Sequence, residues 1–168
     1  MTYVHSTTGV TADFSGTFAG TNDASGDQFI GIENLTGSNF NDSLYGNGND
    51  NILDGGLGTN LLNGGGGFDT ASYLSATGAV TITLTGGGTG NVTGAGRTDS
   101  LVSIERVIGS NFADTINGSA GDEWIDAGLG ADTISAGGGN DTISFASATG
   151  GRSAVSYTHL TLPTILRV

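Results

Sequence analysis

A nine-residue period sets the strongest limit on how this chain can fold. Residues 109–144 divide into four units, GSNFADTIN, GSAGDEWID, AGLGADTIS and AGGGNDTIS, and residues 37–72 divide into four more in the same phase. Each unit opens with glycine or alanine, has an acid or amide at its sixth place and an aliphatic residue at its eighth. A repeat that fixes the turn, the polar residue and the apolar residue together is typical of a stacked coil.

The period predicts the local structure of each unit. We expect a tight turn over the first six residues, where glycine permits backbone angles that a Cβ forbids, and then a minimal strand whose eighth residue points inward. Two units make one full coil, so each strand stacks on the strand two units further along the chain. The inward residues are Leu44, Leu53, Leu62 and Ala71 in the first run, and Ile116, Ile125, Ile134 and Ile143 in the second.

Stacking pairs the sixth-place side chains and predicts a metal site. Asp114 stacks near Asp132 on one edge, and Glu123 near Asp141 on the other. Paired ionised carboxylates repel unless a cation lies between them, and the turn glycines add carbonyl oxygens to the same gap. Those glycines are Gly128, Gly130, Gly137 and Gly139. Carboxylate and carbonyl oxygens in a flexible site suit Ca²⁺, which takes roughly six to eight oxygen ligands. Zn²⁺ would require His or Cys, and the two runs contain neither.

The first run has weaker candidates for metal ligation. Asp42 stacks with Asn60, and Asn51 with Asp69, so each pair keeps one carboxylate. An amide offers only a neutral oxygen, and we expect these sites to bind Ca²⁺ weakly or not at all.

The composition narrows the class of protein. Sixteen acids against four arginines give a net charge of −12, which disfavours nucleic acid and anionic membrane surfaces as partners. No apolar run approaches the roughly 20 residues of a membrane helix. The sequence has no HExxH or GxSxG motif and no cysteine, so we expect it not to be an enzyme.

The units of the form GGxGxDxUx, where U is apolar, resemble the RTX, or haemolysin-type, calcium-binding repeats. AGGGNDTIS, AGLGADTIS and GGGGFDTAS come closest, and the resemblance covers residues 32–72 and 104–145 well and the spacer loosely. It implies an all-β fold, a parallel β-roll with Ca²⁺ between successive turns. It further implies a secreted, extracellular protein exported by the type I route, with calcium ions and other domains of a larger parent chain as partners.

The chain divides into five segments by pattern. Residues 1–36 are expected to form β-solenoid coils that end a preceding block, and residues 37–72 the first run. Residues 73–108 form a spacer of wider coils, where Val80, Ile82 and Leu84 alternate with threonine as in a half-buried strand. Residues 109–153 hold the second run. Val155 to Thr164 resembles a translated sequencing adaptor, so we expect residues 154–168 to be a non-native tail on a fragment of a longer protein.

Several residues outside the period have other expected roles. Glu33 and Glu105 occupy equivalent places before the two runs and are expected to be strand-end charges or turn caps. We expect Asp50, Asp54, Asp122 and Asp126 to be solvated, Arg97 and Arg106 to pair with acids at the surface, and Trp124 to pack on a neighbouring coil or lie exposed.

Two other functions remain open at this point. The chain could be a metal-independent structural β-solenoid of an adhesin or surface protein. Alternatively, it could be an accessory module of a secreted hydrolase or polysaccharide-modifying enzyme.

Overall fold

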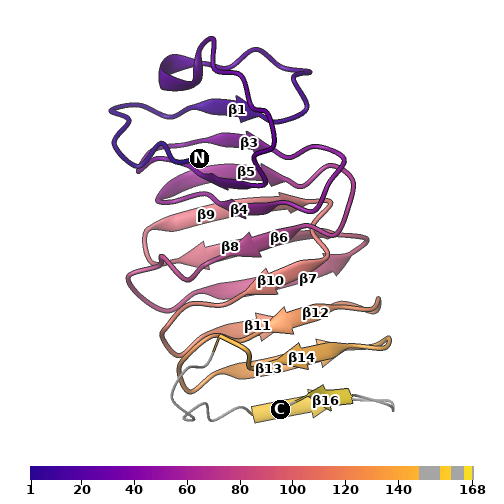
Figure 1. The fold of residues 1–168 in the computed structure, drawn as a ribbon. Helices are drawn as coiled ribbons and strands as arrows, with labels where there is room; N and C mark the ends of the chain where they lie inside the picture. The colour runs from indigo at the N-terminus through magenta and orange to yellow at the C-terminus, as the bar shows by residue number, and fades with distance from the viewer. Residues whose placement is uncertain (148–155, 160–164, 168) are drawn as a thin grey trace.

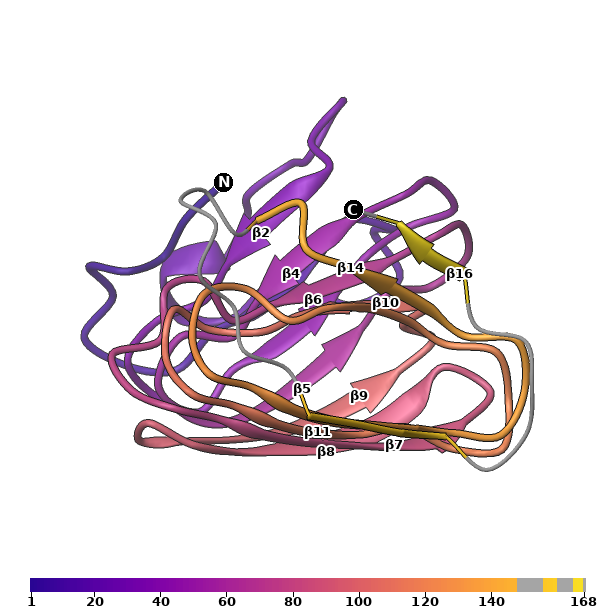
Figure 2. The same cartoon turned by 90° about the horizontal axis from the view of Figure 1, so that it is seen from below.

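The protein is a flattened stack of short strands that winds from one end of the molecule to the other (Figure 1). Its structure is a computed structural model that describes residues 1–147, 156–159 and 165–167. Two sheets face each other across one core, which is visible when the molecule is viewed from below (Figure 2). Most strand pairs are parallel, which confirms the expected all-β parallel β-roll.

Each sheet takes one of the two strands in every coil. Sheet 1 has nine strands in the order β1 (Thr11–Asp13), β3 (Ser43–Tyr45), β5 (Gly58–Asn63), β9 (Arg97–Val102), β8 (Thr89–Gly94), β7 (Thr81–Gly86), β11 (Thr115–Asn117), β13 (Thr133–Gly137) and β15 (Ser156–His159). Sheet 2 has seven, in the order β2 (Asn34–Thr36), β4 (Ile52–Asp54), β6 (Thr70–Ser72), β10 (Arg106–Ile108), β12 (Trp124–Asp126), β14 (Thr142–Ser144) and β16 (Ile165–Arg167). These counts refer to the described residues.

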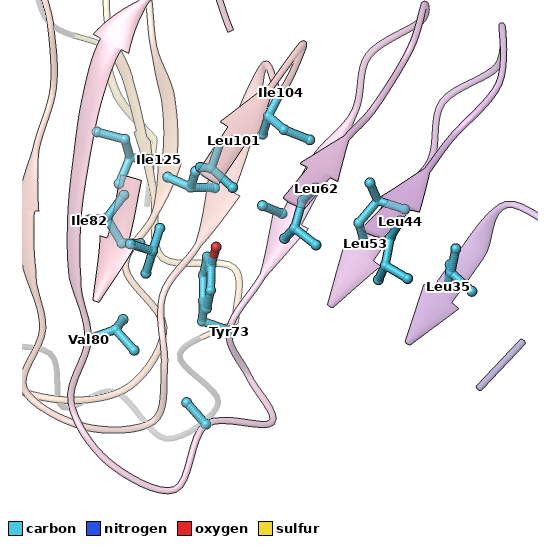
Figure 3. Close-up of a cluster of buried hydrophobic side chains, with 14 of the residues drawn as sticks. Leu35, Leu44, Leu53, Leu62, Tyr73, Val80, Ile82, Leu101, Ile104 and Ile125 are labelled. Atoms are coloured by element: carbon cyan, nitrogen blue, oxygen red, sulfur yellow. The ribbon is translucent and has the colours of Figure 1, made fainter. Parts of the chain in front are cut away.

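The core is built from the eighth-place residues, as predicted. Leu44 pairs with Leu62 and Ile116 with Ile134 in sheet 1, and each pair joins units that are two periods apart in a parallel register. All eight of these residues are at most 2% exposed. Figure 3 shows that Leu35, Leu44, Leu53 and Leu62 project into the same interior from successive strands. One inward aliphatic side chain per strand therefore forms a continuous apolar column.

The spacer, expected as wider β coils over residues 73–108, contains antiparallel strand pairs. The alternating residues from Val80 do form a strand, β7, but it pairs antiparallel with β8, which pairs antiparallel with β9. This three-strand meander lies between β5 and β11 in sheet 1, whereas sheet 2 has only β10 between β6 and β12. Alternation of apolar and polar residues marks a strand but does not specify the direction in which it pairs.

The two ends of the chain extend the same stack. Residues 1–36 contribute β1, β2 and a short 3₁₀ turn at Asn22–Ala24. At the other end, β15 pairs with β13 and β16 with β14. The rest of the segment 154–168 lies outside the described residues, and its non-native origin stays a prediction. No helix in the described part of the chain is long and apolar enough to span a membrane.

Candidate metal centre

The residues two places before the inward core residues of the strands form two ladders, one along each edge of the stack. The strand registers place Asp42, Asn60 and Asp99, and further along Asp114 and Asp132, in the first ladder. They place Glu33, Asn51, Asp69, Glu105, Glu123 and Asp141 in the second ladder. Every sixth-place residue named from the sequence thus belongs to a ladder.

One contact recurs in all four predicted pairs. A side-chain oxygen of the later residue accepts the backbone N–H of the residue two units earlier. The distances are 2.9 Å for Asn60 and Asp42, 2.8 Å for Asp69 and Asn51, 3.0 Å for Asp132 and Asp114, and 3.1 Å for Asp141 and Glu123. All eight side chains are buried. The structure therefore brings each predicted pair together on one edge.

In the first ladder, the earlier carboxylate of each pair is already well hydrogen-bonded. Asp114 accepts the N–H and the hydroxyl of Ser110, both at 2.6 Å, and the N–H of Val80 at 2.8 Å. Asp42 has the same contacts with Ser38 and Val10. Burial nevertheless raises the pKa of Asp42 above its ordinary value, although these hydrogen bonds oppose the shift.

The second ladder leaves buried oxygens without hydrogen-bond partners. Asp69 Oδ2 and Glu123 Oε2 are buried, and neither has a partner in the described part of the chain. Burial, together with the charges of Glu105 and Asp50, raises the pKa of Asp69 to about 6. Burial also raises the pKa of Glu123, and the neighbouring Asp141 adds to the effect. Buried carboxylate oxygens without donors are the groups that a shared cation would stabilise.

The turn glycines are required by the close approach of successive turns. Gly128 and Gly130 have φ of 82° and 133°, and Gly137 and Gly139 have φ of 91° and 100°, where a Cβ is disfavoured. A Cβ on any of the four would overlap a backbone carbonyl group of the turn below. These carbonyls therefore line the interface between stacked turns, beside the ladder side chains.

Carboxylates alone do not complete a site. Among the described residues, no three His, Cys, Asp or Glu side chains converge to hold a metal ion. An ion between two turns would thus need carbonyl oxygens as well as the two ladder residues. Such an all-oxygen donor set fits Ca²⁺ and does not fit Zn²⁺.

Sequence reasoning missed three members of the ladders. Glu105 accepts the N–H of Asp69 at 2.8 Å, the same contact that the sixth-place residues make. Glu33 precedes Asn51, and Glu105 precedes Glu123, by two units of the period, so the period itself was the available signal. Asp99 is fully buried and accepts the Asn60 amide at 2.8 Å. It belongs to the meander, whose spacing breaks the period.

The expectation that Asp54 and Asp126 are solvated is wrong. Asp126 is fully buried and lies 3.5 Å from Arg106, whereas Asp54 is 13% exposed and lies 3.5 Å from Arg97. Both acids stand at the ninth place of a unit, where the chain enters the next turn. Asp50 and Asp122 are exposed as expected, and each also accepts a backbone N–H from the turn two units later.

Arg97 is also not at the surface. Its side chain is 2% exposed, and its guanidinium lies 5.5 Å from the ring centre of Tyr73. The neighbouring Asp99 has a pKa of about 6 because burial outweighs the opposing effects of Asn60 and Arg97. A protein cation therefore lies among the buried acids of the spacer.

The comparison with protein families agrees with the stacked nine-residue repeats described above. The model of the RTX calcium-binding nonapeptide repeat, which spans four copies, matches residues 29–62, 36–71 and 105–144. No significant match to a curated protein sequence was found. The matched ranges cover both runs except Ser72, and they contain all four pairs of stacked sixth-place residues. The repeats of this family bind calcium. The chain belongs to the RTX calcium-binding nonapeptide repeat family.

Proposed function

We propose that the second run binds Ca²⁺ between its stacked turns, on both edges of the roll. Asp114 and Asp132 would supply carboxylate oxygens on the first edge, and Glu123 and Asp141 on the second. Carbonyl oxygens at Gly128, Gly130, Gly137 and Gly139 would complete the two sites. The observation that carries this proposal is the contact of each later carboxylate with the residue two units earlier, inside a buried and oxygen-rich interface.

The first run should bind Ca²⁺ more weakly. The side-chain amide of Asn60 already makes two hydrogen bonds. Its oxygen accepts the backbone N–H of Asp42, and its nitrogen donates to the carboxylate of Asp99. Asn51 likewise accepts the N–H of Asn47 at 2.7 Å. Only Asp69 has a buried oxygen without a partner in this run's described pairs. The site of Asn51 and Asp69 is therefore the better candidate in the first run.

Calcium binding should also order the second run. Without an ion, folding must bury several carboxylates that repel each other, and each unit buries only one aliphatic side chain in return. That side chain contributes roughly 1.5–3 kcal/mol, and ordering a residue costs about 1–2 kcal/mol in backbone entropy. An ion that binds only the folded state shifts this balance by mass action. Ca²⁺-dependent folding fits a module of a larger secreted protein that acts outside the cell and has no catalytic role of its own.

Calorimetry and circular dichroism test the proposal on the full chain. We expect Ca²⁺ to bind with measurable heat. We also expect the β signal in circular dichroism to increase when the chelator is replaced by millimolar Ca²⁺. The double variant Asp132→Asn with Asp141→Asn should lose the second-run sites. Asp50→Asn is the matched control, because Asp50 is exposed and uses one oxygen to accept a backbone N–H that an amide can also accept. Absence of heat together with an unchanged spectrum would defeat the proposal.

A metal-independent structural solenoid is the second candidate function. Both oxygens of Asp42 and both oxygens of Asp114 accept hydrogen bonds from the protein, so these two carboxylates are partly satisfied without an ion. In that case the protein would already show the full β signal in the presence of a chelator, and added Ca²⁺ would not raise its unfolding midpoint.

A further inference from the structure

A hollow of about 500 Å³ opens on the second edge, beside the spacer. It lies next to the turn before β10, which spans only residues 103–105, whereas most turns of the repeats span six residues. The tip of the β7–β8 hairpin forms another side, where Gly88 O accepts the N–H of Ile104 at 2.9 Å. The hollow therefore lies where the irregular spacer meets the stacked turns of the second run, which contribute residues such as Asp122 and Asn140.

The walls combine aromatic rings with negative charge. Phe68 and Trp124 line the hollow with ring centres 5.3 Å apart in an edge-to-face arrangement, and they are 39% and 41% exposed. Glu105, Asp122 and Glu123 contribute carboxylates. Of the described residues that line the hollow, none is a lysine, arginine or histidine.

This lining selects among ligand classes. A volume of this size suits a small molecule, since such sites span roughly 300–1,000 Å³. A bare metal ion would gain nothing from the apolar walls, and an anion would be repelled by the carboxylates. Aromatic rings beside carboxylates attract a cation that has an apolar body.

We propose that the hollow binds a small organic cation of the alkylammonium class. Its charged group would pair with Glu105 and Asp122, and its apolar part would pack against Phe68 and Trp124. Arg106 lies 5.9 Å from the Trp124 ring centre and does not line the hollow. The Trp124 ring therefore already makes a cation–π contact with an arginine of the protein itself. Glu105, Asp122 and the two rings are not among the proposed Ca²⁺ ligands. Glu123 also lines the hollow, so this site adjoins the proposed Ca²⁺ site of Glu123 and Asp141.

Trp124 makes the test direct, because it is the only tryptophan of the chain. Choline is the probe, and 3,3-dimethylbutan-1-ol, which has the same shape without the charge, is the control ligand. Both are titrated into the full chain at saturating Ca²⁺ while Trp124 fluorescence is recorded. We expect a saturable change with choline and none with the neutral alcohol at equal concentration.

Two variants with matched controls identify the carboxylates. Glu105→Gln should weaken choline binding about tenfold, the effect of losing one charge pair. Glu33→Gln, which alters the exposed equivalent before the first run, should leave binding unchanged. Asp122→Asn should also weaken binding, whereas Asp50→Asn should not. Glutamine and asparagine keep an oxygen for the backbone N–H groups that Glu105 and Asp122 accept, so the fold should persist.

Three results would overturn the proposal. The first is equal binding of the neutral alcohol, which would show an apolar hollow without charge selection. The second is unchanged choline affinity in both Glu105→Gln and Asp122→Asn. The third is stoichiometric displacement of choline by further Ca²⁺, which would make the hollow a metal site. Terbium luminescence recorded in parallel shows whether the turn sites are loaded, so failure here is distinct from failure of the proposed function.

Discussion

The buried cation of the spacer provides the sharpest test of the energetics. Arg97→Met removes a guanidinium whose side chain is 2% exposed and lies 3.5 Å from Asp54. The change leaves Asp54 and the fully buried Asp99 without their neighbouring positive charge. Methionine preserves much of the apolar stem, so the loss is mainly electrostatic.

The magnitude follows from burial and distance. Deleting one partner of a buried ion pair costs roughly 3–5 kcal/mol, because the other charge stays buried and unpaired. The separation of 3.5 Å between the Arg97 guanidinium and the Asp54 carboxylate is longer than the roughly 2.7–2.9 Å of a strong charge-assisted hydrogen bond. The lower end of this energy range therefore applies. We therefore expect a loss of about 3 kcal/mol, a large share of the roughly 5–15 kcal/mol that stabilises a typical domain.

Arg106→Met is the matched control. Arg106 lies at the same 3.5 Å from Asp126, but its side chain is 29% exposed. Asp126 also keeps the N–H groups of Gly128 and Ser147, at 3.3 and 3.2 Å. Because solvent screens the Arg106 guanidinium and the two N–H donors still compensate the buried Asp126 carboxylate, we expect a smaller loss of about 1 kcal/mol.

Urea unfolding at saturating Ca²⁺ gives the free energy of unfolding of each variant. A rescue is also expected, since Arg97→Met combined with Asp54→Asn and Asp99→Asn leaves none of these three buried charges unpaired and should recover most of the loss. Equal losses for the two arginine variants, or a loss below about 0.5 kcal/mol for Arg97→Met, would refute the assignment of Arg97 as a buried counter-ion.

Two further predictions concern protonation and turn geometry. Asp69 and Asp99 have folded pKa values of about 6, above the ordinary value of 3.8, so the folded state binds more protons than the unfolded state between these values. With Ca²⁺ removed by a chelator, the protein should therefore gain stability as the pH falls from 7.5 to 5, by at most roughly 1.4 kcal/mol for each group, and a urea midpoint that falls steadily over this range would contradict it. Gly128→Ala combines a φ of 82° with overlap of a carbonyl in the turn below, whereas Gly87→Ala has a φ of 62° in open space. Gly128→Ala should thus cost clearly more than the roughly 1–2 kcal/mol of Gly87→Ala, as measured by urea unfolding.

The repeats could be predicted from the sequence because one period governs both the backbone and the core. Leu44 and Leu62, or Ile116 and Ile134, have to stack once a coil closes every two units. The same spacing placed Asp114 beside Asp132 on one edge. Which oxygens keep free acceptor positions was not predictable, because it depends on neighbours such as Ser110 that donate from within the turn.

The spacer resisted prediction because its contacts do not follow the period. Asp99 pairs in register with Asn60 only after the chain has made an antiparallel meander between them. Glu105 keeps the two-unit spacing to Glu123, but its three-residue turn hides the relationship. Burial of Arg97 likewise depends on Tyr73 and Asp54, which the chain brings together from separate coils.

The meander makes the two walls of the roll unequal in length. From β5 to β11, sheet 1 takes four steps between neighbouring strands, while sheet 2 takes two from β6 to β12. Adjacent strands lie about 4.8 Å apart, so one wall is longer by about 10 Å. A longer protein with one such meander in each block of run and spacer would bend the same way at every block. It would follow an arc whose concave side is sheet 2, and its overall curvature would scale with the number of blocks.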